Sequence, residues 1–213
     1  GLGCGPPAPI TCTLRQAITA ADAIGGNNVI NFALGSQGPY AITLTSQLPP
    51  INTAGVAHNL TIDGYSQMGS VKNTNAPDQG GINATLMIEI VGASGTVGFW
   101  YAGGTAATSL TVQGLSLRGF TSPISAVDST TFNLNVYGSF IGTKIDGTAL
   151  ATQGNSDAIR LGKGTSHVGG TLPEQRNLIS GNATGVLVPA GGTVVIEGNL
   201  IGTDASGTGA HTN

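Results

Sequence analysis

Two carboxylates stand where they could act together. Asp63 and Glu89 each follow a short alternating apolar segment, in TIDGY and MIEIV. On adjacent strands, two such carboxylates could share a proton or bind Ca²⁺, which would suit an enzyme that cleaves polysaccharides. The alternative is a pair of solvated carboxylates on a strand surface. It is favoured because no Lys or Arg falls in the same predicted column of side chains.

Three consecutive aromatic residues form a second candidate site. They lie within GFWYAGG, from Gly98 to Gly104, where Trp100 and Tyr101 could offer a flat surface to a sugar ring. Partial burial beneath a loop is the alternative, and it is the favoured one.

Two glycine-rich segments each carry one acidic residue, Asp146 in IDGTA and Asp204 in DASGTG. One carboxylate supplies few of the six to eight oxygens that Ca²⁺ takes, so a role in the turn itself is favoured. The three histidines lie more than 40 residues apart, and the chain has no P-loop, nucleophile elbow or zinc-protease motif. The sequence therefore predicts no cofactor, and calcium at Asp146 or Asp204 is only a weak alternative.

Short alternating apolar segments recur along the chain and would position these side chains. Their inner residues are Leu60-Ile62, Leu86-Ile88, Leu110-Val112, Leu134-Val136 and Val194-Ile196, with Val168 as a shorter member. The second inner residue recurs after 26, 24, 24, 32 and 28 residues. This period, with almost no helical pattern, indicates an all-β solenoid whose strands stack about 4.8 Å apart. Asp63 and Glu89 would then lie on adjacent rungs.

Turn residues recur with the same segments. The phrase GNLIGT near residue 200 has a shorter relative, RNLISGN, near residue 180. We expect Asn177, Asn182 and Asn199 to occupy turns, where their amides bond the backbone or one another in a ladder.

The N-terminal segment differs from the rest. TLRQAITAADAIGG has the spacing of an amphipathic helix, with Thr13 as its N-cap and Gly25 as its stop, and this helix would cap the first coil. Cys4 and Cys12 are the only cysteines and are close enough to form a disulfide, which favours an oxidising, extracellular compartment. No signal peptide pattern precedes them, so we expect an exported, mature form from which the signal has been removed.

Composition narrows the possible partners. Charged residues make up 8% of the chain, the formal net charge is -3, and the seven Lys and Arg are scattered. This argues against nucleic acid, and no apolar run is long enough for membrane insertion. Polysaccharide, cell-surface components and further copies of the chain remain as candidate partners.

The segment CTLRQAITAADA resembles the CSLREAI segment of secreted bacterial and archaeal repeat proteins. TIDGYSQMGS, VGGTLPEQRNLISGNATGVLV and GNLIGTDASGTGA resemble later segments of the same family. The resemblance implies a single right-handed parallel β-helix that is secreted or surface-exposed and often adhesin-like, with no transferable active site. Gln16 departs from the usual Glu, without changing the expected capping role.

The sequence therefore predicts one domain over 1–213, with a leader and capping helix over 1–26 and β-helix coils over 27–213. Because more repeats normally follow GTDASGTGA in the family, we expect either the N-terminal part of a longer protein or a unit completed by another copy. Met87 and Val195 are expected to be apolar on the outer face, and the residues from Gly207 to Asn213 to be open for pairing. The leading hypothesis is an extracellular structural protein that self-assembles, as a filament or array; a carbohydrate-active or sugar-binding module is the alternative.

Overall fold

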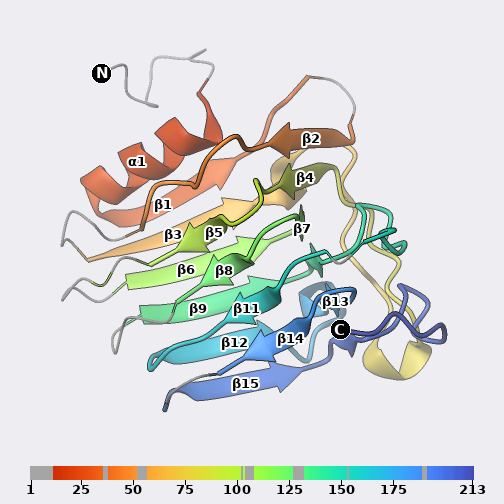
Figure 1. The fold of residues 1–213 in the computed structure, drawn as a ribbon. Coiled ribbons are helices and arrows are strands. Elements are labelled where there is room, and N and C mark those ends of the chain that lie inside the picture. The colour runs from red at the N-terminus through yellow and green to blue at the C-terminus, as the bar shows by residue number, and fades with distance from the viewer. Residues whose placement is uncertain are drawn as a thin grey trace.

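The computed structural model describes residues 12–35, 38–51, 57–101, 103, 108–126, 132–152, 154–188 and 191–213. In these residues one α-helix precedes three parallel sheets (Figure 1). Sheet I contains β1 (Gly26–Asn31), β3 (His58–Asp63), β6 (Thr108–Gln113), β9 (Phe132–Tyr137), β12 (Thr165–Gly169) and β15 (Thr193–Glu197). Sheet II contains β2 (Tyr40–Thr43), β4 (Ile88–Val91), β7 (Leu115–Arg118), β10 (Phe140–Ile141), β13 (Leu178–Ile179) and β16 (Leu200–Ile201). Sheet III contains β5 (Val97–Trp100), β8 (Ser122–Ser125), β11 (Asp157–Arg160) and β14 (Thr184–Leu187).

The chain passes through these sheets in turn. From β3 to β14, every strand of sheet I is followed by one of sheet II and then one of sheet III. Each strand inside a sheet pairs in parallel with its equivalent one pass earlier and one pass later, and an edge strand has one such partner. We call one pass a coil. The arrangement is solenoid-like, as the repeat period predicted.

Stacked aliphatic side chains fill the space enclosed by the three sheets. Leu60, Leu110 and Leu134 lie in register and are at most 1% exposed. Equivalent stacks come from sheet II, including Ile90 and Leu117, and together they form one continuous core. The predicted alternation therefore identified the inner residues of sheet I correctly.

One predicted rung was assigned to the wrong sheet. Ile88 does not stack on Ile62; it pairs with Tyr40 and Leu115 in sheet II. The sheet I partner that precedes Ile62 is Ile30. The error arose because residues 64–87 form an insertion between β3 and β4. The alternating segment that follows this insertion is therefore a strand of sheet II and not of sheet I.

Glycine is required where sheet I turns into sheet II. Gly114 has φ +67°, and a Cβ there would lie 2.8 Å from the backbone nitrogen of Tyr65. Gly138 has φ +55° at the equivalent corner of the next coil. L side chains rarely adopt such positive φ values, which explains Gly at these two corners. At Gly64, the corresponding corner of the preceding coil, a Cβ would instead meet the carbonyl oxygen of Gly114.

Helix α1 (Leu14–Ile24) covers the first coil. Thr13 Oγ1 accepts a hydrogen bond from Gln16 N, and Gln16 Oε1 accepts one from Thr13 N, which completes a capping box. The helix ends at Gly25, and its apolar side chains Leu14 and Ile18 are buried in the core. The predicted helix, its N-cap and its stop are confirmed. In the described part of the chain, helices are too short or too polar to cross a membrane.

A long excursion covers the outer face of sheet II. Residues 64–87, which we call the strap, include the 3₁₀ turns η1 (Gly64–Ser66) and η2 (Pro77–Gln79). In Figure 1 the yellow part of the strap lies beside the blue C-terminal segments. A second apolar cluster lies between strap and sheet, formed by Ile82 and Leu86 with Phe140 and Leu178. Another 3₁₀ turn, η3 (Pro173–Gln175), precedes β13.

Candidate functional site

The predicted carboxylate pair does not form. Asp63 ends β3 in sheet I, between Asn31 and Gln113, whereas Glu89 lies in β4 of sheet II, between Ala41 and Ser116. The two residues therefore lie on different sheets, and the adjacency expected from the sequence was wrong. Asp63 instead accepts a hydrogen bond of 2.9 Å from Tyr65 N and so caps η1.

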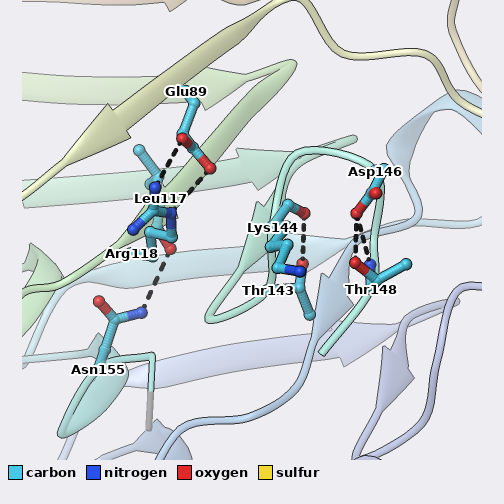
Figure 2. Close-up of polar contacts among 8 residues, drawn as sticks. All are labelled: Glu89, Leu117, Arg118, Thr143, Lys144, Asp146, Thr148 and Asn155. Atoms are coloured by element: carbon cyan, nitrogen blue, oxygen red, sulfur yellow. Dashed lines mark hydrogen bonds and ion pairs between the residues drawn. The ribbon is translucent and has the colours of Figure 1, made fainter. Parts of the chain in front are cut away.

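Glu89 has a cationic partner that the predicted column did not include. Its Oε1 and Oε2 accept hydrogen bonds of 2.9 Å each from Nε and Nη2 of Arg118 (Figure 2). Arg118 ends β7, the next strand of sheet II, and lies in register with Val91. Two parallel N–H to oxygen bonds form the strong fork geometry of Arg and carboxylate.

The two members of this pair differ in exposure. The side chain of Arg118 is 31% exposed and that of Glu89 is 10% exposed. The hydrogen bond from Arg118 to Glu89 is the main cause that raises the pKa of the guanidinium, and burial opposes it. A carboxylate that is held by two hydrogen bonds and largely covered is positioned to fix Arg118, and Arg118 is the member that solvent reaches.

A groove runs along the corner between sheets II and III, next to this pair. Its volume is about 580 Å³, and it crosses three successive coils. Its lining consists of Gly92, Ser94, Gly95, Gly119, Phe120, Thr121, Gly154, Asn155 and Ser156. Arg118 directly precedes the lining residue Gly119, and Asp157, which pairs with Arg160 at 3.3 Å, directly follows Ser156. The groove is thus lined by small residues, hydroxyls and an amide, and Arg118 and Asp157 are sequence neighbours of its lining.

The buried side-chain amide of Asn155 holds the backbone around the groove in position. Asn155 Oδ1 accepts a hydrogen bond of 3.0 Å from Phe120 N. Figure 2 shows the second bond, in which Asn155 Nδ2 donates to the carbonyl of Leu117 at 3.3 Å. The same Nδ2 donates to Asn182 Oδ1 at 2.8 Å. These bonds fix the shape of neighbouring corners and give the groove a rigid floor.

Asn155 and Asn182 belong to a ladder that continues to Asn213. Asn182 Nδ2 donates to Asn213 Oδ1 at 2.8 Å, and Asn213 Nδ2 donates to the carbonyl of Ile179 at 2.9 Å. A second ladder joins Asn177 Nδ2 to Asn199 Oδ1 at 2.8 Å. The predicted turn roles of Asn177, Asn182 and Asn199 are therefore confirmed.

The aromatic segment does not form a sugar-stacking surface. Tyr101 is 1% exposed, and its ring lies 4.5 Å from that of Phe132 inside the coil. Trp100 is half-buried, and its indole N–H donates to the carbonyl of Leu48 at 2.9 Å. The ligand site was the less favoured of the two interpretations of this segment. Tyr101 is too buried to offer its ring to a sugar, and the indole N–H of Trp100 anchors the loop that contains Leu48.

The two calcium candidates stabilise turns. Asp146 Oδ1 accepts hydrogen bonds from Thr148 N and Oγ1 at 2.9 and 2.6 Å (Figure 2). Asp204 Oδ1 accepts from Ser206 N and Oγ at 3.0 and 2.6 Å and from Gly209 N at 3.2 Å. These side-chain hydroxyl bonds lower the pKa of both carboxyls. Within the described ranges, no group of three or more His, Cys, Asp or Glu is placed to hold a metal ion.

The four residues that the sequence suggested for contacts between copies, Met87, Val195, Gly207 and Asn213, lie in different environments. Met87 is half-buried, and its thioether lies against Gly38 and Gly69, so it is partly covered by neighbouring segments of the same chain. Val195 is half-buried in β15 and pairs with His167. Gly207 lies in the turn after Asp204, donating its N–H to the Asp204 carbonyl at 3.0 Å. The side chain of Asn213 accepts a hydrogen bond from Asn182 and donates one to the carbonyl of Ile179.

Cys4 lies outside the described residues, so the proposed bridge to Cys12 stays a prediction. Sequence reasoning missed Arg118 and Asn155. A signal for Asn155 was present, because the dipeptide Gly-Asn occurs both in QGNSD and, 27 residues later, in SGNAT.

Comparison of the chain with models of protein families, with curated proteins and with solved structures finds no match. The site therefore rests on its own geometry.

Proposed function

We propose that this chain is an extracellular structural protein, a building block of a cell-surface layer, matrix or fibre. We propose further that the coils wind as one right-handed parallel β-helix, since crossovers between parallel strands of a sheet are right-handed in almost all proteins. The predicted disulfide supports an extracellular location. The low content of charged residues supports self-association, because little charge repulsion opposes contact between copies.

The observation that carries this proposal is the C-terminal edge, formed by β14, β15 and β16. Each of these is the last strand of its sheet. Ile196 is 43% exposed, whereas its register partner Val168 is 0% exposed; Ile201 is 46% exposed, and its partner Ile179 is 0% exposed. An edge that combines unpaired backbone groups with uncovered core side chains favours the addition of more β-structure.

The opposite end does not offer the same surface, because α1 covers the first coil. Two copies of residues 1–213 would therefore meet through these edges, in a two-fold contact that uses the same residues on both sides. Such a pair is closed, so a larger layer or fibre would also need lateral contacts between pairs.

Sedimentation velocity of the purified chain over a range of micromolar concentrations tests the proposal. We expect a dimer in the wild type and a monomer in Ile196→Lys and Ile201→Lys. Val29→Lys is the matched control, because Val29 is 58% exposed but lies in β1 at the other end of sheet I. A wild-type monomer throughout the range would contradict the proposal, and electron microscopy of the same material would show whether pairs extend into arrays.

A second candidate function is the binding or cleavage of a polysaccharide in the corner groove. It is supported by the hydroxyl-bearing lining and by Arg118, which Glu89 orients beside the groove. Titration with a panel of neutral and acidic polysaccharides, with assay for released reducing ends or unsaturated products, tests it. Loss of a signal in Glu89→Gln together with Thr121→Val would locate the activity, and absence of binding across the panel would exclude it.

A further inference from the structure

A buried cation without a carboxylate partner joins the strap to the late coils. Arg176 is 2% exposed, and within the described part of the chain it forms no ion pair. Burial lowers the pKa of its guanidinium. A charge in such a position is costly unless it is fully hydrogen-bonded, so the carbonyl groups around it are essential to its placement.

Five backbone carbonyls satisfy this guanidinium. Nε donates to Gly198 O at 2.8 Å; Nη1 donates to Asn75 O at 2.8 Å, Ala76 O at 3.0 Å and Gly81 O at 3.3 Å; Nη2 donates to Gly80 O at 2.9 Å. Four of the five acceptors belong to residues 75–81 of the strap, which close around the side chain. The planar donors of Arg suit a ring of carbonyls of this kind, whereas the point charge of Lys does not.

Other contacts tie the strap to coils far from its own. Tyr65 Oη donates to Gly138 O at 2.8 Å, Asn73 Nδ2 donates to Pro173 O at 2.7 Å, and Ile82 N donates to Ala205 O at 2.7 Å. The strap leaves the coil that begins with β3 and reaches Ala205, which follows β16. It therefore spans the intervening coils along the outer face of sheet II.

We propose that Arg176 is a latch that closes the strap over sheet II and makes the early and late coils unfold as one cooperative unit. Repeat proteins ordinarily interact only between neighbouring repeats, so their terminal coils can fray independently. A latched strap would remove this independence by coupling coils that share no strand pairing. The proposal concerns the isolated chain and does not depend on the proposed structural function.

Hydrogen exchange followed by mass spectrometry tests the latch. In the wild type, we expect peptides that cover the strap and peptides that cover β13 to exchange with the same dependence on urea, as one unit would. Exchange of the strap at much lower urea, independently of β13, would overturn the proposal without the need for any variant.

Substitution of Arg176 provides a second test of the latch. In Arg176→Met, which keeps much of the side-chain volume but has no donors, we expect strap amides such as that of Ile82 to exchange at least tenfold faster, while those of β6 stay protected. Arg160→Met is the matched control, because the Arg160 side chain is 40% exposed and, among the described residues, its ion pair is with Asp157. Equal strap protection in Arg176→Met and wild type would contradict the latch.

Arg176→Lys separates charge from geometry. Lys has fewer donors than Arg, and a buried Lys loses its charge more readily. We therefore expect the strap to be less protected than in the wild type near neutral pH and to lose further protection as the pH rises. A variant with the same strap exchange as the wild type from pH 6 to pH 9 would show that the planar guanidinium is not required and would also contradict the latch.

Discussion

The side-chain amide of Asn155 donates a hydrogen bond of 2.8 Å to Asn182 Oδ1, and Asn182 donates in turn to Asn213 Oδ1 at the same distance. Asn155 and Asn182 are at most 3% exposed. One column of amides thus continues across successive coils and bonds the backbone at each.

Replacement of Asn182 by Ala should destabilise the protein strongly. The change removes the buried side-chain hydrogen bonds of Asn182 with Asn155 and with the carbonyl of Ile141, and its bond to Asn213, and each lost bond of this kind costs about 1–3 kcal/mol. We expect the free energy of unfolding, measured by urea denaturation, to fall by about 2–4 kcal/mol. Asn59→Ala is the control: Asn59 bonds Asn27 on the exposed face of sheet I, so its loss should be below about 1 kcal/mol.

The corner glycines give a second matched pair. Gly114→Ala forces a side chain into φ +67° and against Tyr65, whereas Gly95→Ala has φ +80° but no neighbouring atom within 4 Å. Backbone strain alone costs about 1–2 kcal/mol, and the added clash should raise the loss for Gly114→Ala to about 3–5 kcal/mol. Thermal unfolding of both variants checks the difference, and equal losses would show that space at the corner is not limiting.

The ion pair between Glu89 and Arg118 on sheet II should stabilise the folded protein more than the pair between Asp157 and Arg160 on sheet III. Glu89→Gln removes the charge from a double hydrogen bond with a largely covered carboxylate, and we expect a loss of about 1–2 kcal/mol. Asp157→Asn removes a single contact of 3.3 Å with a 40% exposed Arg160, and should cost about 0.5 kcal/mol or less. A double-mutant cycle with Arg118→Met would measure the coupling directly.

The turn after β16 should depend on pH. The pKa of Asp204 is lowered in the folded protein, mainly by the hydroxyl of Ser206. A lowered folded pKa means that the stabilising contribution is complete above the unfolded value, near 3.9, and is lost as the pH falls through the folded value. Amide NMR signals of Ser206 and Gly209 should therefore shift below about pH 4. In Asp204→Asn this transition should be absent; if it persists, another group causes it.

The sequence by itself determined the parts of this fold that depend on local chemistry. Each of these parts involves a few neighbouring residues: the inward-facing Leu60 and Ile62 separated by a polar residue, the positive φ of Gly114, and the capping box of Thr13 and Gln16. The roles of Asn177 and Asn182 could also be predicted, since short phrases containing them recur along the chain.

Only the tertiary structure decided which strands lie next to one another. Because residues 64–87 form a strap and not a coil, equal spacing in the sequence placed Glu89 beside Asp63, whereas pairing in space placed it beside Arg118. Likewise, nothing local to Arg176 indicates that carbonyls about 100 residues away surround its side chain. Spacing in the sequence gives only the number of residues between two side chains. In a solenoid with insertions, the register of the paired strands decides which side chains become neighbours.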